Sequence, residues 1–232
     1  MTWSDRLSLF TPLDFAALAL AVLAWQALSF VIEHPPKGRI SVSQIMAAYR
    51  RAWMQEMITR EPRIFDAQII GSLRQGTAFF ASTAVLAIGG TLALIGNADA
   101  LTDIATELLL SADPAFVWEL KLVVVALFLT NAFLKFVWSN RLFGYASVLM
   151  GAVPNDIAHP LCAPRAAQAA EINVTAARAF NRGLRSVYFA LASAVWLGGP
   201  VPYLAAILFT CLVIWRREFA SQSRRILLEN AP

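Results

Sequence analysis

The sequence predicts an all-α protein, a polytopic transmembrane helical bundle. The first reason is composition: 58% of the 232 residues are hydrophobic, 15% are charged and the mean hydropathy is +0.59, whereas soluble domains are typically ~45–50% apolar and ~25% charged. The second reason is a series of long apolar stretches. The third is that most Lys and Arg residues lie in alternate connecting segments. We expect one transmembrane domain over residues 1–232, with spans at about 12–32, 71–96, 114–138, 186–198 and 203–216.

The first span is expected at 12–32, because about 20 residues at 1.5 Å each cross a ~30 Å hydrocarbon core. Pro35 and Pro36 end this helix. A cytoplasmic amphipathic helix follows at about 41–60, starting at Ser41 or Ser43. Its apolar residues recur at three- and four-residue spacing, and Arg50 and Arg51 are expected to lie away from that face.

The second span belongs to the segment 62–96, which begins polar and continues as an unbroken apolar run from Thr77. As one helix starting at Pro62 it would be ~50 Å long, so we expect its first turns to stand in the headgroups or the cytoplasm. A stripe of small or polar residues follows one face: Gly71, Gln75, Ala78, Ser82, Gly89, Ala93 and Gly96. In lipid such stripes are typical of helix–helix contacts.

A short amphipathic helix is expected within 97–113, and the third span at 114–138, closed by the polar residues 139–141. An Ala-rich helix is expected from about Arg165. The last apolar region, 186–216, is interrupted at Gly198–Pro202 by two glycines and two prolines. We therefore predict three full spans plus a C-terminal two-helix hairpin, with a single broken span as the alternative.

The distribution of Lys and Arg predicts the threading. Six basic residues lie between the first two spans, none lies between the second and third, and the region after the third is again basic. The positive-inside rule therefore places residues 33–70, 139–185 and 216–232 in the cytoplasm. We expect a multi-pass protein of the cell inner (plasma) membrane, with the N-terminus outside and the C-terminus cytoplasmic.

Four stretches carry a family resemblance: MAAYRRAWMQEM (46–57), RIFDAQIIGSLRQGTAFFASTAVLAIGG (63–90), LKFVWSNRLFGYASVLMGAVP (134–154) and RAFNRGLRSVYFALASAVW (178–196). Together they resemble the DUF599 family of membrane proteins, whose function is unknown. The resemblance implies a multi-span membrane protein. It implies no reaction, ligand or catalytic residue.

Motifs of catalysis and cofactor binding are missing from the sequence. It has no H-E-x-x-H, paired C-x-x-C, G-x-S-x-G, phosphate loop or G-x-G-x-x-G. His159 lies near Asp156 without a further ligand, and Cys162 and Cys211 are expected to be reduced. We therefore predict no catalytic residue, no metal and no cofactor. An enzyme that acts on lipid is the third hypothesis, behind the two non-enzymatic ones given below.

Polar residues near membrane depth are the remaining candidates. Gln68, Ser72, Gln75 and Ser82 of the second span, with Asn131 and Lys135 of the third, would line a pathway or make helix contacts. The alternative for the first group is a stem in headgroups and water, in which Arg63 pairs with Asp66. Lys135 would otherwise reach the interface and Asn131 bond a neighbouring helix. A third group, Arg178, Arg182 and Arg185, is expected to contact anionic lipid headgroups at the cytoplasmic face.

Two functional hypotheses follow. The first is a homo-oligomeric channel- or transporter-like assembly, since the helices of one chain enclose little space. The second is a non-conducting accessory or scaffold subunit bound to another membrane protein. The expected partners are the lipid bilayer, further copies of the chain or another membrane protein, and no nucleic acid, because no basic block lies on a soluble domain.

Overall fold

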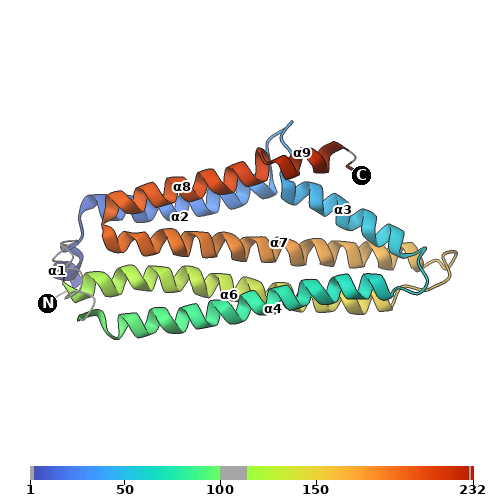
Figure 1. The fold of residues 1–232 in the computed structure, drawn as a ribbon, viewed down its shortest axis with the longest axis horizontal. Helices are drawn as coiled ribbons and strands as arrows, with labels where there is room; N and C mark the ends of the chain where they lie inside the picture. The colour runs from blue at the N-terminus through green and yellow to red at the C-terminus, as the bar shows by residue number, and fades with distance from the viewer. Residues whose placement is uncertain (1–2, 100–113, 230) are drawn as a thin grey trace. The chain divides into compact units, whose positions relative to one another are not determined.

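The computed structural model describes residues 3–99, 114–229 and 231–232, and every regular element in these ranges is a helix (Figure 1). This confirms the all-α prediction. Three of the described helices, α2, α4 and α6, are long and apolar enough to cross a membrane. In chain order the elements are α1 (Trp3–Leu7), α2 (Pro12–Glu33), α3 (Val42–Met57), α4 (Ile64–Ile95), α6 (Ala115–Gly151), α7 (Cys162–Ala194), the 3₁₀ turn η1 (Val195–Gly198), α8 (Pro200–Phe219) and α9 (Gln222–Glu229).

The amphipathic helix predicted at 41–60 is α3, with Ser41 as its N-cap. The Ser41 hydroxyl accepts a hydrogen bond from the Gln44 backbone N–H and donates one to the Ile32 carbonyl at the end of α2. This side chain therefore satisfies one backbone group of each of two helices. The helix predicted within 97–113 falls largely on residues 100–113, outside the described ranges.

Two predicted helix ends were wrong. The helix expected to begin at Pro62 begins at Ile64, and the one expected to close at 139–141 continues to Gly151. The polar residues there do not end α6, because their side chains form hydrogen bonds with backbone carbonyls of other helices. Ser139 donates to the Ala176 carbonyl, and the Asn140 amide donates to the Arg74 carbonyl.

The predicted break in the last apolar region lies at Gly199. This residue has φ of 106°, a conformation that L side chains rarely adopt, and Pro200 then opens α8, the position where a missing N–H costs least. The segment before the break is not a separate short helix. It is the end of α7, which runs without interruption from the Ala-rich residues after Cys162 to Ala194.

The chain divides into two compact units, and α2, α4, α6, α7 and α8 each contribute residues to both. We call Met1–Phe30, Thr83–Ala132 and Leu184–Trp215 the apolar unit, and Val31–Ser82, Phe133–Gly183 and Arg216–Pro232 the basic unit. Of the 19 Lys and Arg residues, the apolar unit holds only Arg6, Lys121 and Arg185. The other 16 lie in the basic unit with 8 of the 15 Asp and Glu residues, giving it a formal charge of +8.

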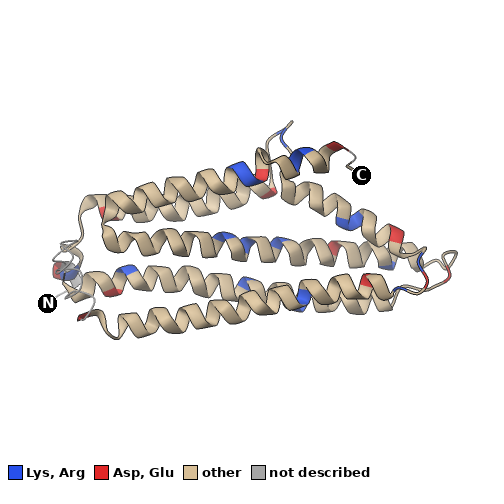
Figure 2. Ribbon diagram, in the orientation of Figure 1, with Lys and Arg blue, Asp and Glu red and all other residues tan. Residues whose placement is uncertain are grey.

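The apolar unit combines a small-residue contact with an apolar exterior. Ala17 and Ala21 of α2 are fully buried, as expected for a close helix contact. Figure 2 shows long parts of α2, α4 and α8 without a charged residue. Large apolar side chains of this unit point outward, a distribution typical of a surface that faces lipid; among them are Leu23, Leu86, Leu127, Leu191, Leu208 and Phe209.

The basic unit has its own buried core. Its members come from α3, α4, α6, the loop after α6 and α7, and the alanines of α7 allow the other helices to pack closely on it. The core contains Met54, Met57, Ile70, Leu142, Phe143, Ala146, Met150, Val153, Cys162, Ala166, Ala169, Ala170 and Ala176. The segments predicted to be cytoplasmic coincide closely with this unit. The side of the membrane on which it lies stays a prediction.

Candidate functional site

The polar residues predicted on the second span form an outward-facing row on α4. Gln68, Ser72, Gln75 and Ser82 are all exposed. The buried residues of α4 lie on the opposite face of the helix: Asp66, Ile70, Thr77, Ala84 and Thr91. We call Gln68, Ser72, Gln75 and Ser82 the α4 row.

The glycines of α4 are not explained by packing within the described chain. A Cβ built on Gly71, Gly76, Gly89 or Gly90 would meet nothing within 4 Å. Gly183 of α7 is different, because its Cβ would lie 2.6 Å from a ring carbon of Phe136. Intrachain packing therefore requires a glycine at position 183 and not at these four positions of α4.

Asn131 is occupied within the apolar unit. Its amide donates a hydrogen bond to the Ser186 hydroxyl at 2.7 Å, which joins α6 to α7. Close by along α7, Arg185 is 4% exposed and donates to the Ser29 hydroxyl of α2 at 3.0 Å. These contacts connect helices, so neither side chain points to the exterior of the unit.

Lys135 lies in the basic unit, half-buried on α6. It makes no hydrogen bond or ion pair with any residue in the described ranges. Asn131 lies four residues earlier on the same helix, and its amide is bound to Ser186.

Asp14 organises a buried cluster in the apolar unit, which sequence patterns alone did not indicate. Its carboxylate accepts hydrogen bonds from the Thr11 backbone N–H and hydroxyl at 3.0 and 2.6 Å, and from the Trp196 indole N–H at 2.7 Å. The Thr11 hydroxyl in turn accepts from the Asp14 backbone N–H, which is a reciprocal cap of α2. Trp196 stacks on Tyr203, whose hydroxyl lies 3.2 Å from that of Ser193. The cluster joins α2 to the turn before α8.

Asp66 is likewise the acceptor at the centre of a buried hydrogen-bonded cluster, in the basic unit. It is fully buried and accepts hydrogen bonds from the Trp53 indole at 2.6 Å and from Arg60 at 2.5 Å. The expected Arg63–Asp66 pair is wrong. Arg63 instead donates to the carbonyls of Val153 and Pro154 at 2.6 and 2.9 Å, because it reaches the loop after α6, where free carbonyls are available.

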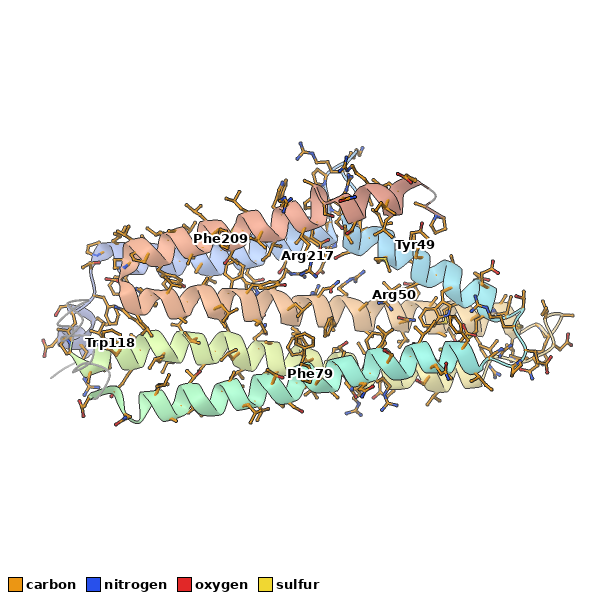
Figure 3. All side chains as sticks on the ribbon, in the orientation of Figure 1. Tyr49, Arg50, Phe79, Trp118, Phe209 and Arg217 are labelled. Carbon is orange, nitrogen blue, oxygen red and sulfur yellow. The ribbon has the colours of Figure 1, made fainter. Side chains whose placement is uncertain are left out.

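A polar seam joins α3 to α7 in the basic unit. Three contacts define it: Ser43 with Asn181 at 3.5 Å, Arg50 with Asn173 at 2.5 Å, and Arg51 with Glu171 at 2.5 Å. Residue numbers rise on α3 as they fall on α7, so the two helices are antiparallel. The expectation that Arg50 lies away from the packed face was wrong: it extends from α3 toward α7 (Figure 3) and lies over the Phe143 ring.

The three arginines predicted to contact lipid headgroups have different surroundings. Arg178 is exposed. The half-exposed Arg182 forms a two-pronged ion pair with the nearly buried Glu33. Arg185 is buried in the apolar unit. Only Arg178 and Arg182 present charge at a surface.

The sequence did not predict which polar residues pair with each other across different helices. Arg50 and Asn173 are 123 residues apart, and nothing in their local patterns links them. The usable signal was the polarity of Asn173 within an Ala-rich helix. Within the described ranges no group of three or more His, Cys, Asp or Glu could hold a metal ion, and both cysteines are free.

Comparison with known proteins identifies a family without an activity. Residues 16–223 match the family model DUF599, described as a protein of unknown function. No curated protein and no solved structure matches the chain.

Proposed function

The chain belongs to the DUF599 family, and from this premise we propose that it acts in the cell inner membrane as a homo-oligomeric, channel- or transporter-like assembly. Three candidate membrane helices support the membrane part. The observation that carries the oligomeric part is the outward orientation of the α4 row. Those polar side chains would face a neighbouring copy or an enclosed aqueous path.

The glycines of α4 support a contact between copies. A glycine within a helix costs up to ~1 kcal/mol relative to alanine, and no contact in the described chain requires Gly71 or Gly76. Small residues allow helix backbones to approach closely, which is how helices associate in lipid. A second copy of α4 would provide the contact that the single chain lacks.

The same face would supply a pathway if the copies enclose water. Amide and hydroxyl groups along one helix face give a hydrophilic lining. We include Lys135 as a candidate because it is half-buried and unpaired among the described residues. Asn131 is the weaker candidate, since its amide is engaged with Ser186.

The charge of the basic unit supports a cytoplasmic location and contact with anionic lipids. Its formal charge is +8, and Lys and Arg are concentrated in cytoplasmic segments of membrane proteins. Arg178 and Arg182 are two of its exposed or half-exposed arginines on α7, suitable for phosphate headgroups. In this arrangement the C-terminus is cytoplasmic and the N-terminus lies outside.

The mass of the protein in native detergent or nanodiscs tests the oligomer. We expect a closed oligomer for the unmodified chain, a smaller species for Gly71→Leu, and no change for Ala205→Leu, which adds similar bulk to an exposed position of α8. An unmodified chain that stays monomeric without a partner would refute the proposal. If Gly71→Leu assembles like the unmodified chain, the α4 face is not the contact.

Ion flux from liposomes tests conduction separately. In a conducting oligomer, Gln75→Leu and Lys135→Met should lower the flux or change its ion selectivity, because each removes a polar or charged group from the lining. Flux that is the same in both variants would remove these residues from any pathway.

A non-conducting scaffold is the second candidate. This alternative is favoured because the side chains of Asn131 and Arg185 form hydrogen bonds between helices. Such bonds stabilise a bundle, and they leave these two side chains unavailable to line a pathway. A closed oligomer without flux, or a stable complex with another membrane protein, would support this alternative.

A further inference from the structure

Arg50 differs from Arg51 and Arg182, which join α7 to its neighbours through ion pairs. Arg51 pairs with Glu171, and Arg182 pairs with Glu33. Hydrogen bonds donated to these carboxylates raise the pKa values of Arg51 and Arg182. Arg50 has only the neutral amide of Asn173 and the Phe143 ring as partners among the described residues. Burial lowers the pKa of the Arg50 guanidinium. It is a partly desolvated cation without a counter-charge in the described chain.

Asn173 has an unused donor at the same place. Its side chain is fully buried, its Oδ1 accepts from Arg50, and its Nδ2 has no hydrogen-bond partner. A buried donor without an acceptor destabilises the folded state. The two amide atoms share one carbon, so an acceptor at Nδ2 would also lie close to the guanidinium.

The missing component is therefore an acceptor that carries negative charge. Arg50 uses only Nη1 toward Asn173, so the rest of its planar fork is available for a second acceptor. Arginine forks match the geometry of phosphate oxygens. The formal charge of +8 on the basic unit also favours an anion.

We propose that Arg50 and Asn173 form a binding site for a phosphate-type anion at the seam between α3 and α7. One anion oxygen accepts from Asn173 Nδ2, and another accepts from the free N–H groups of Arg50. The anion is either a lipid headgroup phosphate or free phosphate. The site does not depend on assembly of copies.

The first experiment measures thermal unfolding of the full chain in neutral detergent with inorganic phosphate, at ionic strength held constant with chloride. A parallel arm uses nanodiscs of phosphatidylcholine with or without phosphatidylglycerol. We expect at least one probe to raise the melting temperature, because a ligand that binds the native state stabilises it. A response to phosphate alone indicates a free anion, and a response to phosphatidylglycerol alone indicates a headgroup. No response to either probe overturns the site.

Asn173→Asp is the sharpest variant. It changes the shape of the side chain little, places a carboxylate beside Arg50 and would repel an anion. We expect a folded protein that has lost the response to the effective probe. Arg50→Lys keeps the charge without the fork and should weaken binding about tenfold or more. Arg225→Met removes an exposed arginine of α9 and should keep the full response. If Asn173→Asp responds like the unmodified chain, the site is refuted.

Discussion

Replacing Gly183 with alanine should destabilise the protein, although alanine is the better helix former. The new Cβ would lie 2.6 and 2.8 Å from two ring carbons of Phe136. Phe136 is fully buried and packs against Phe80 and Phe180 at centroid distances of 5.5 and 5.4 Å, so the ring has no room to retreat. Overpacking of this kind costs about 1–3 kcal/mol, against a gain in helix propensity of up to ~1 kcal/mol. We expect a net loss of about 1 kcal/mol.

The matched control is Gly71→Ala in α4, where the new Cβ meets nothing within 4 Å. Within a single chain only the propensity gain remains there, so a monomeric sample of this variant should be as stable as the unmodified chain or up to ~1 kcal/mol more stable. Unfolding of both variants in the same detergent measures the difference, and 1 kcal/mol corresponds to roughly 2–4 °C in melting temperature for a chain of this size. A double variant with Phe136→Leu should recover part of the loss at position 183. If Gly183→Ala gains stability like Gly71→Ala, the packing argument is wrong.

Three further predictions concern the basic unit. Asp66→Asn should lower the free energy of unfolding by about 2–3 kcal/mol. The reason is that the Arg60 guanidinium then faces a neutral amide in place of a fully buried carboxylate. A denaturant titration that shows no change would contradict this. Ser41→Ala should cost about 1 kcal/mol or more in the same titration, since the cap of α3 and the bond to the end of α2 are both lost, whereas Ser41→Asn should recover part of the cap. The hydrogen bond from Arg51 lowers the pKa of Glu171 below its ordinary value, so the pair stabilises the fold above about pH 4.3 and this stabilisation is lost as pH falls through the folded-state pKa. Both side chains are about half exposed, which limits the effect to ~0.2–1 kcal/mol, and a Glu171→Gln variant should lack this part of the pH dependence.

Local patterns predicted the elements of this fold well where one strong signal dominated. The apolar runs predicted α2, α4 and α6 as candidate spans, and the spacing of apolar residues together with Ser41 predicted α3 and its start. The glycine and proline residues at 198–202 predicted the break before α8. Each of these signals lies within a few residues of the feature it describes.

The predictions failed where distant contacts decide the outcome. The polar residues after Trp138 read as a helix end, but bonds to Arg74 and Ala176 allow α6 to continue. The pairing of Arg63 with Asp66 was inferred from helical spacing, yet Arg60 and Trp53 occupy Asp66. Helical spacing alone does not make Arg63 the partner of Asp66, because Trp53 and Arg60 already donate hydrogen bonds to this buried carboxylate.

By itself, the sequence determined that this is a multi-helix protein, and it located three helices long and apolar enough to cross a membrane, the amphipathic helix and the chain break, because hydropathy and local backbone preference act over short distances. Only the tertiary structure decided which polar residues are occupied and which are free. It placed the α4 row on the outside, engaged Asn131 with Ser186 and directed Arg50 onto Asn173. Those outcomes depend on which helices pack together, and no local pattern contains that information.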